Sequence, residues 1–343
     1  MDRKKLSGWQ KSVRARRRKR SAHEYIAKIA AGDRYVLSQA ITLVESDSPR
    51  HKNLADEIVS GCLKIPQHNT MRIGITGTPG VGKSTFIDNF GLHLVDKGYK
   101  IAVLAVDPTS QHTKGSILGD KTRMEKLSRS DNAYIRPSPA GDSLGGVTRK
   151  TRESIILCEA CKFDIIIVET VGVGQSETAV HGMVDFFLLL LLANSGDELQ
   201  GIKRGIMEMA DAIAINKADG ENKAASEFAA TRFQSSLDLF PQQYKWRPQV
   251  TTCSALTNSG IDNIWHIIEE HKELMRRHNF FHHKRHLQEK KWLHNLIVQK
   301  LKDDFYQHDK IKDILPDMER KVCDGNLLVT TAAKKLVDLH KTN

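Results

Sequence analysis

Hydrophobic and polar positions divide the chain into three parts with different periods. Between His23 and Lys64, apolar side chains recur every three or four residues, which predicts amphipathic helices. From Met71 to about Glu270, short apolar runs alternate with longer amphipathic stretches. Residues 271–343 are polar, charged and helical in period. This pattern predicts a helical cap, a central α/β domain and a carboxy-terminal helical arm.

The short apolar runs of the central part predict strands. They cover residues 72–76, 101–106, 133–136, 164–169, 185–192, 212–216 and 249–253. Several runs are apolar throughout rather than alternating, which is typical of strands that helices cover on both faces. Because the runs alternate with helical stretches, they predict βαβ units and an α/β fold with an open, mostly parallel sheet.

The net charge of +11 is concentrated at the amino terminus. Residues 1–20 hold ten of the 52 Lys and Arg but one of the 41 Asp and Glu, so the rest of the chain is close to neutral. A nearly neutral body does not favour a nucleic-acid partner. We expect residues 1–22 to form a basic, disordered arm, while contact of the arm with an acidic partner or nucleic acid and a transit peptide stay open. The expected location is cytoplasmic, or the mitochondrial matrix if the arm is a transit peptide.

The apolar runs and the cysteines indicate whether the protein spans a membrane and which redox compartment suits it. The longest strongly apolar run, residues 186–193, is far shorter than the roughly 20 residues of a membrane span, so no transmembrane segment is predicted. Five cysteines, an odd number in a long chain, are typical of a reducing compartment. Cys158 and Cys161 have C-x-x-C spacing without a second pair nearby, which favours buried thiols over a zinc or redox site.

The chain contains a complete phosphate-binding motif, Gly77-Thr-Pro-Gly-Val-Gly-Lys83-Ser84, between a predicted strand and a predicted helix. Its glycines let backbone N–H groups point at phosphate oxygens together with the helix N-terminus. Lys83 is expected to neutralise the β- and γ-phosphates, and the Ser84 hydroxyl to bind Mg²⁺. The candidate residues of this loop are Gly77, Thr78, Pro79, Gly80, Val81, Gly82, Lys83, Ser84 and Thr85.

A second motif selects the base. Residues 216–219, N-K-A-D, follow a predicted strand and match the N-K-x-D that reads guanine in GTPases. The Asp219 carboxylate can accept hydrogen bonds from guanine N1–H and the 2-amino group, whereas adenine would leave it unpaired at a cost of about 1–3 kcal/mol. Residues 254–256 resemble the S-A-x loop whose backbone N–H supports guanine O6. The candidate base-contacting residues are Asn216, Lys217, Asp219, Ser254, Ala255 and Leu256.

Acidic residues at other strand ends are candidates for a metal site. Asp107 follows the run 101–106 and is placed to bind Mg²⁺ or its waters, although a plain strand-end turn stays open. Glu169 begins E-T-V-G, where most GTPases have a D-x-x-G whose acid reaches the metal and whose glycine, here Gly172, contacts the γ-phosphate. Gln175 and Glu177 follow in the same predicted loop, either to position water or as plain loop residues.

Five segments taken together carry a resemblance to one family. They read L-A-V-D-P at 104–108, G-S-I-L-G-D-K-T-R-M at 115–124, E-T-V-G-V-G-Q-S-E at 169–177, G-D-E-L-Q-G-I-K at 196–203 and N-K-A-D at 216–219. They closely resemble the MeaB/ArgK family of methylmalonyl-CoA mutase-associated GTPases, which includes the methylmalonic aciduria type A protein. The resemblance covers residues 23–275 densely, and the glutamate at 169 is what this family has.

The resemblance implies roles for further residues. Asp120 joins Asp107 and Glu169 among the acids of the family's metal and switch shell. Residues 196–203 match a loop that contacts the partner and supplies a lysine, here Lys203, for activated hydrolysis. The implied metal ligands are Ser84, Asp107, Asp120 and Glu169, and the implied catalytic residues are Lys83, Glu169 and Lys203. Two departures from the family, A-N-S at 193–195 and Lys114 in place of a glycine, change no ligand but fall in loops.

The resemblance also implies a fold and a function. The fold is a P-loop NTPase with a helical cap at 23–66, a GTPase domain at 67–270 and a helical dimerisation arm at 271–343. The function is Mg²⁺-dependent hydrolysis of GTP by a homodimeric, metallochaperone-type GTPase. It would gate delivery of adenosylcobalamin to methylmalonyl-CoA mutase, or a related adenosylcobalamin-dependent mutase, and protect or reactivate that enzyme. Adenosylcobalamin would be a cofactor of the partner only.

Two other functions stay open. Proteins with these motifs have also been described as kinases or ATPases linked to transport of basic amino acids. A nickel-insertion GTPase is the second alternative, because seven histidines lie between residues 266 and 294. Of these, His278, His282 and His286 have a spacing that would align three imidazoles on one helical face. Interleaved Lys and Arg favour a solvated helical arm instead.

Overall fold

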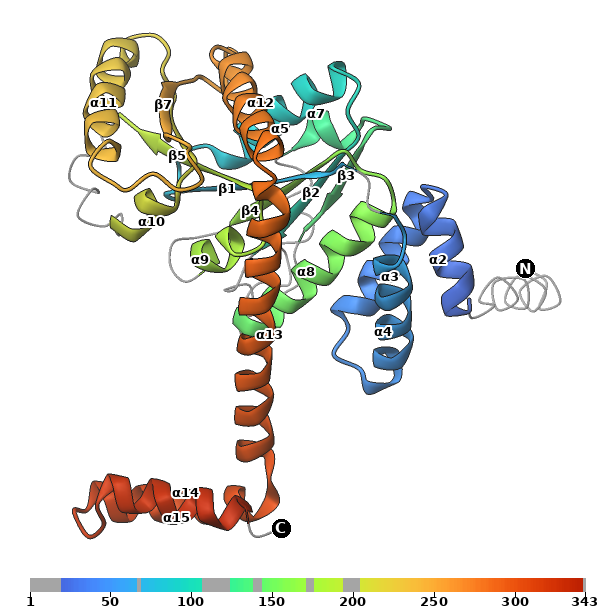
Figure 1. Ribbon diagram of the computed structural model, residues 1–343, viewed down its shortest axis with the longest axis vertical. Coiled ribbons are helices and arrows are strands. Elements are labelled where there is room, and N and C mark those ends of the chain that lie inside the picture. Colours follow the sequence, from blue (N-terminus) through green and yellow to red (C-terminus); the bar gives the residue numbers. More distant parts are fainter. Residues whose placement is uncertain are drawn as a thin grey trace, which may run out of the picture. The chain divides into compact units, whose positions relative to one another are not determined.

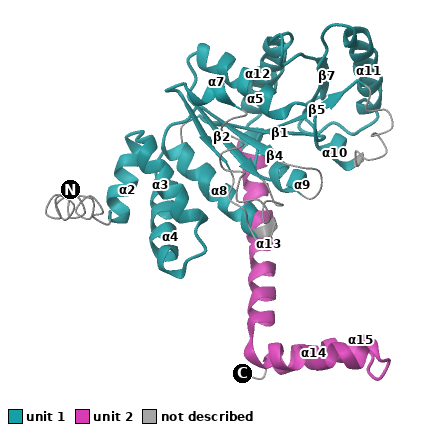
Figure 2. Ribbon diagram, turned by 180° about the vertical axis from the view of Figure 1, so that it is seen from behind, with its two compact units in different colours: residues 1–281 teal, residues 282–343 magenta. Residues whose placement is uncertain are grey.

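The computed structural model describes residues 20–66, 69–106, 124–137, 144–170, 176–193 and 204–341. Asp107, Asp120, Gly172, Gln175 and Lys203 therefore lie outside the described residues. The chain divides into two compact units, residues 1–281 and 282–343 (Figure 2). Within the described ranges, no helix combines the length and apolarity needed to cross a bilayer.

Seven strands form one sheet in the order β3-β2-β4-β1-β5-β6-β7, and every pairing between them is parallel. The strands are β1 (Met71–Gly77), β2 (Ile101–Val106), β3 (Ala133–Arg136), β4 (Ile165–Thr170), β5 (Phe186–Leu192), β6 (Ala212–Asn216) and β7 (Gln249–Thr252). Each predicted strand matches one of these within a residue at either end, so the open parallel α/β sheet is confirmed. Because all strands run the same way, their carboxyl ends share one edge, where open α/β sheets bind ligands.

Helices cover both faces of the sheet (Figure 1). On one face lie α5 (Lys83–Asp96), α7 (Glu125–Ser128) and α12 (Ile261–Arg277), and on the other α8 (Leu144–Ala160), α9 (Ser176–His181), α10 (Arg204–Met209) and α11 (Asn222–Leu237). Successive residues of a strand point to opposite faces. Leu188 of β5 therefore packs in the cluster with α5 and α12, whereas Leu189 packs in the cluster with α11. This two-sided burial explains why β5 is apolar throughout.

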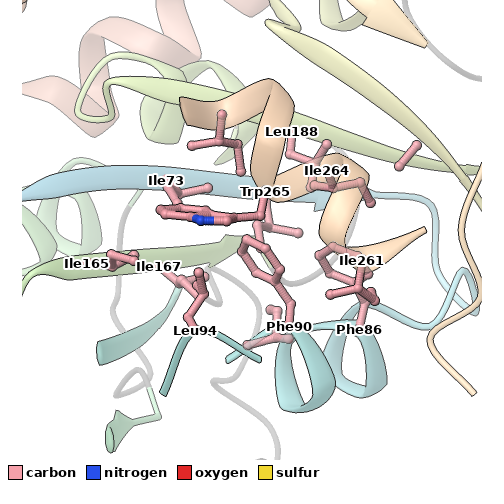
Figure 3. Close-up of a cluster of buried hydrophobic side chains, with 14 of the residues drawn as sticks. Ile73, Phe86, Phe90, Leu94, Ile165, Ile167, Leu188, Ile261, Ile264 and Trp265 are labelled. Carbon is pink, nitrogen blue, oxygen red and sulfur yellow. The ribbon is translucent and has the colours of Figure 1, made fainter. Parts of the chain in front are cut away.

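Aromatic side chains fix α5 beside the sheet. Figure 3 shows Phe86 and Phe90 of α5 gathered with Trp265 of α12 and Ile73 of β1. The ring centroids of Phe86 and Phe90 are 5.4 Å apart, and those of Phe90 and Trp265 are 6.3 Å apart. All four side chains are buried. The helix that begins at the phosphate-binding motif is thus anchored by a dense apolar contact along its first two turns.

Three amino-terminal helices form a cap over α8: α2 (Ala22–Ala30), α3 (Arg34–Glu45) and α4 (Pro49–Leu63). Their apolar faces share one core with α8 and with β2 and β4. Two ion pairs add to this contact, one between Arg136 and Glu45 and one between Lys150 and Asp47 at 2.7 Å. The predicted helical cap is therefore packed into the same compact unit as the sheet.

The cysteines of this contact are buried, as the sequence predicted for Cys158 and Cys161. Cys62, Cys158 and Cys161 are each less than 5% exposed. Burial raises the pKa of the Cys62 thiol to about 12 and that of Cys161 to about 11. Because the thiolate is the reactive form, these two thiols are poor nucleophiles and poor metal ligands at neutral pH.

Unit 2 consists of helices. It holds most of α13 (Phe280–Gln307), with α14 (Asp309–Cys323) and α15 (Val329–Lys341) packed together as a pair. Ile311 of α14 and Leu336 of α15 are buried, whereas Leu293, Ile297 and Leu301 of α13 are 57%, 46% and 63% exposed.

The structure changes the interpretation of the histidine-rich segment. Helix α12 ends at Arg277 and α13 begins at Phe280, so His278 does not share a continuous helix with His282 and His286. The predicted alignment of three imidazoles is therefore wrong. His271 is also not solvated: it is 1% exposed, with ring contacts to Phe186 and Trp246.

Candidate nucleotide-binding site

The predicted phosphate loop lies between β1 and α5, at the edge formed by the carboxyl ends of the strands. Two of its glycines are required by close approach. A Cβ on Gly77 would lie 2.4 Å from the Leu190 carbonyl oxygen of β5. Gly82 has a φ of +94°, and a Cβ there would lie 3.1 Å from Asn216 Nδ2. Gly82 is also the N-cap of α5, so the free N–H groups of the first helical turn begin at the loop.

The Lys83 ammonium lies over this loop. Its Nζ donates hydrogen bonds to the carbonyl oxygens of Gly77 at 2.7 Å and Thr78 at 3.2 Å. Burial lowers the pKa of Lys83, while the nearby carboxylates of Glu169 and Glu177 act to raise it. The Thr78 hydroxyl is buried and has no hydrogen-bond partner among the described residues. The loop thus holds a positive charge and an unpaired hydroxyl, both of which suit an anionic ligand.

Two oxygen donors expected at the metal site lie next to each other. The Ser84 hydroxyl donates to Glu169 Oε1 at 3.3 Å. Glu169 is 5% exposed in β4, in register with Ile75 of β1 and Ala105 of β2, which places its carboxylate among the central strands. A hydroxyl and a carboxylate are ligands that Mg²⁺ prefers, so this pair fits the ion. The other two predicted ligands lie outside the described residues.

Glu177 differs from its predicted setting. It lies in the helix α9 rather than in a loop, and it is 1% exposed. Its charge acts on Lys83, so this carboxylate belongs to the surroundings of the phosphate loop. In the sequence, Glu177 lies close to the E-T-V-G motif that begins at Glu169. Only the position of α9 beside β1 and β4 brings Glu177 near Lys83.

Asn216 connects the phosphate loop with the predicted base-contacting segment at residues 254–256, the base loop. Its Nδ2 donates to the Val81 carbonyl oxygen at 2.9 Å, across 135 residues of sequence. Its Oδ1 accepts from the Ala255 N–H at 3.1 Å and from Cys253 Sγ at 3.5 Å. Asn216 is 2% exposed, so water does not reach its amide. Losing one of these hydrogen bonds would leave a buried polar atom unpaired, which costs free energy. The Asn216 side chain therefore holds the phosphate loop and the base loop at a fixed separation.

Asp219 is held in place by the base loop. Ser254 Oγ donates to Asp219 Oδ2, and the same hydroxyl accepts from the Thr257 N–H at 3.2 Å. Lys217 adopts a φ of +60°, and the Ala218 N–H donates to the Cys253 carbonyl oxygen at 3.0 Å. These contacts hold the carboxylate at the end of β6, and within the described ranges its Oδ1 accepts no hydrogen bond.

The structure thus brings together the predicted phosphate loop, Glu169 and both base segments. Sequence reasoning missed one residue of this assembly, Asn89 of α5, whose Nδ2 donates to the Ala255 carbonyl oxygen at 2.7 Å. Asn89 belongs to none of the motifs and lies 166 residues from its partner, so no local signal marked it.

Comparison with known proteins places these features in a family. The family model described as methylmalonyl-CoA mutase-associated GTPase MeaB matches residues 37–310. The chain is 46% identical over 320 residues to a protein of Escherichia coli named GTPase ArgK, covering 93% of this chain and 96% of that protein. It is 45% identical over 324 residues to a Mus musculus protein named methylmalonic aciduria type A homolog, mitochondrial, covering 92% of this chain and 78% of that protein.

A solved structure has the same fold. The crystal structure described as a LAO/AO transport system kinase matches with a TM-score of 0.76 and 37% sequence identity. The match covers 94% of this chain and 98% of that chain.

Proposed function

The chain belongs to the MeaB family of methylmalonyl-CoA mutase-associated GTPases, and from that membership we propose that its GTP hydrolysis serves an adenosylcobalamin-dependent acyl-CoA mutase. In this proposal the GTPase gates delivery of adenosylcobalamin to methylmalonyl-CoA mutase or a related mutase, and protects or reactivates that enzyme. The family description names the mutase, and the mouse relative is named for methylmalonic aciduria. The cofactor would be bound by the partner enzyme.

The observation that carries the nucleotide-binding proposal is the double contact of Asn216. One side chain links the Val81 carbonyl of the phosphate loop to the Ala255 N–H of the base loop. A ligand that fits both loops must have a phosphate chain and a base at a set separation. Asp219, which Ser254 holds at the base end, would accept hydrogen bonds from guanine N1–H and the 2-amino group. GTP satisfies both requirements.

The chain's own residues would act by position and charge. Lys83 would exchange its two loop carbonyls for β- and γ-phosphate oxygens, and the N–H groups at the start of α5 would bind the phosphates. Ser84 and Glu169 would hold Mg²⁺, which neutralises charge on the phosphates when it is bound. Phosphoryl transfer to water then needs no covalent intermediate with the protein.

Four predicted residues outside the described ranges complete the proposal. Asp107 and Asp120 would join the metal shell, and Gly172 would contact the γ-phosphate. Lys203 would bring a second cation to the γ-phosphate when the partner is bound, as an arginine finger does for about 10³–10⁵-fold acceleration.

We also propose that residues 271–343 form a dimerisation arm. Leu293, Ile297 and Leu301 of α13 recur at four-residue spacing and are each close to half-exposed or more, which is an apolar stripe that a second copy would cover. Light scattering of the full chain should give the mass of a dimer. The change of Ile297 and Leu301 to Asp should give a monomer that still binds GDP, and a wild-type monomer would refute this part of the proposal.

The location stays a proposal as well. The mouse relative is named as mitochondrial. We propose a cytoplasmic protein, with the mitochondrial matrix as the alternative if the basic arm acts as a transit peptide.

Reconstitution with purified methylmalonyl-CoA mutase tests the proposed function. We expect the GTPase to bind the mutase, to hydrolyse GTP faster in the complex, and to permit loading of the apo-mutase with adenosylcobalamin only when GTP is hydrolysable. Lys83→Ala is the control that should lose all nucleotide dependence. Absence of binding to methylmalonyl-CoA mutase and to related mutases would refute the mutase role while leaving the GTPase activity intact.

The structural relative is described as a kinase, and this activity would give a different result. A kinase would move the γ-phosphate of a labelled nucleotide to a protein acceptor, whereas a GTPase releases it as inorganic phosphate. The nickel-insertion alternative loses its main support, because the break between α12 and α13 removes the aligned histidines on which it rested.

A further inference from the structure

The base loop is held by a side chain that belongs to neither nucleotide motif. Asn89 lies on α5, and its Nδ2 donates to the Ala255 carbonyl oxygen at 2.7 Å and to the Thr85 carbonyl oxygen at 3.2 Å. Both neighbours are acceptors, so the amide must turn its nitrogen toward them. The Asn89 amide therefore has one possible orientation, and its hydrogen bond to Ala255 connects α5 to the base loop.

The Ala255 backbone is held from two sides by two amide side chains. Its N–H donates to Asn216 Oδ1 at 3.1 Å, and its carbonyl oxygen accepts from Asn89. Asn216 connects the base loop to the phosphate loop through Val81, and Asn89 connects it to the helix that follows that loop. The base loop is thus fixed relative to both parts of the phosphate site.

This arrangement indicates which backbone donor is available to a base. The Ala255 N–H is already used by Asn216. Thr257 donates its N–H to Ser254 Oγ at 3.2 Å. Between them, the Leu256 N–H has no acceptor among the described residues, and the Leu256 side chain is 81% exposed. The direction of this free N–H depends on the Ala255 peptide, and so on Asn89.

We propose that Asn89 is a positioning residue for guanine recognition. It orients the peptide at Ala255 so that the Leu256 N–H meets guanine O6 while Lys83 meets the phosphates. Asn89 does not touch the nucleotide itself. This inference rests on the proposed base-binding role of residues 254–256 and adds to it the side chain that keeps the loop in register with α5.

Nucleotide analogues separate this role from general stability. GDP and 6-thio-GDP differ at position 6, where sulfur is a poorer hydrogen-bond acceptor than oxygen, but both keep the N1–H and 2-amino groups that Asp219 would bind. IDP lacks the 2-amino group and keeps O6. Calorimetric titration of the full chain with these three nucleotides and ADP therefore reports on the loop contact and on the Asp219 contact separately.

The matched control is Gln234→Ala. Gln234 is also an amide on a helix that holds backbone, because its Nε2 donates to the Pro248 carbonyl oxygen at 3.2 Å and its Oε1 accepts from the Val250 N–H at 2.9 Å. These contacts lie at the amino end of β7, opposite the carboxyl edge of the sheet. Gln234→Ala should leave all nucleotide affinities unchanged.

Asn89→Ala should weaken GDP binding about three- to tenfold, the effect of one hydrogen bond. It should weaken 6-thio-GDP binding less than about twofold, so the preference for GDP over 6-thio-GDP falls. The preference for GDP over IDP should not change. Asn89→Asp keeps the shape but places an oxygen against the Ala255 carbonyl, and it should reduce GDP binding further than Asn89→Ala.

Three outcomes would overturn the proposal. The first is an Asn89→Ala variant that binds GDP as the wild type does. The second is an equal loss of affinity for GDP and for 6-thio-GDP. The third is a variant whose nucleotide-free form melts at a lower temperature while all its nucleotide affinities stay unchanged. If the wild type binds ADP as tightly as GDP, the proposed nucleotide function itself fails, and the two failures are told apart by the wild-type titration alone.

Discussion

Removal of the Ser254 hydroxyl tests whether Asp219 is held ready for guanine. This hydroxyl donates to Asp219 Oδ2 and accepts from the Thr257 N–H at 3.2 Å, and Ser254 is fully buried. In Ser254→Ala both partners lose their bond. A hydrogen bond to a charged group contributes about 1.5–3 kcal/mol. Because Asp219 is half-buried and water replaces part of the contact, we expect the free protein to lose about 1–1.5 kcal/mol of stability.

The effect on nucleotide affinity has a different origin. In the wild type the carboxylate is already ordered, whereas in the variant guanine binding must order it, at a cost of about 0.5–1.5 kcal/mol. That cost corresponds to about a two- to twelvefold weaker Kd. The loss should be the same for GTP and GDP, because the change acts on the base and not on the phosphates. The preference for GDP over IDP should fall, since Asp219 is the proposed partner of the 2-amino group.

Calorimetric titration with GTP, GDP and IDP measures these affinities, and thermal unfolding without nucleotide measures the stability. Ser236→Ala is a suitable control, because Ser236 Oγ donates to the Arg232 carbonyl oxygen at 3.1 Å on the exposed side of α11. An unchanged Kd for GDP in Ser254→Ala, together with an unchanged melting temperature, would refute the reasoning. A loss for GTP but not for GDP would also refute it.

Other predictions concern the phosphate end and the base. Lys83→Ala should abolish GTP hydrolysis, measured as phosphate release; wild-type turnover in this variant would exclude the mechanism. Asp219→Asn should weaken GDP binding by at least tenfold and improve xanthosine diphosphate binding, because the amide donates to the xanthine 2-oxo group; a variant with unchanged preference would contradict the role of Asp219. Glu169→Gln should raise the Mg²⁺ concentration needed for half-maximal hydrolysis several-fold and leave Mg²⁺-free GDP binding within about twofold; an unchanged Mg²⁺ requirement would exclude Glu169 from the metal site. Burial lowers the pKa of Lys83 in the free protein, and a bound phosphate should raise it again. At a pH above the lowered pKa, GDP binding should therefore take up a proton. The affinity for GDP should fall as the pH rises through that pKa. Calorimetry in two buffers of different ionisation heat counts the proton, and the same uptake in Lys83→Met would assign it to another group.

The sequence by itself determined the elements and the local motifs. Strands buried on both faces must be apolar at successive positions, so runs such as Phe186–Leu192 are visible without coordinates. The phosphate loop is contiguous, and its chemistry depends on glycines and a lysine within eight residues, from Gly77 to Ser84. The proposed role of Asp219 in reading guanine was inferred from the N-K-A-D motif at residues 216–219, downstream of the phosphate loop. Each of these features leaves its mark within a short stretch of consecutive residues, which is why the sequence alone reveals it.

The tertiary structure decided what depends on strand order and on where helices end. Periodicity does not specify that β1 lies between β4 and β5, and this order is what brings Glu169 to Ser84. It also does not reveal that α12 stops at Arg277, which separates the histidines that the spacing had aligned. Asn89 carries no motif, because its partner is a backbone carbonyl 166 residues away, and any residue type can supply a carbonyl. Contacts of this kind leave no local pattern, so only the folded chain shows them.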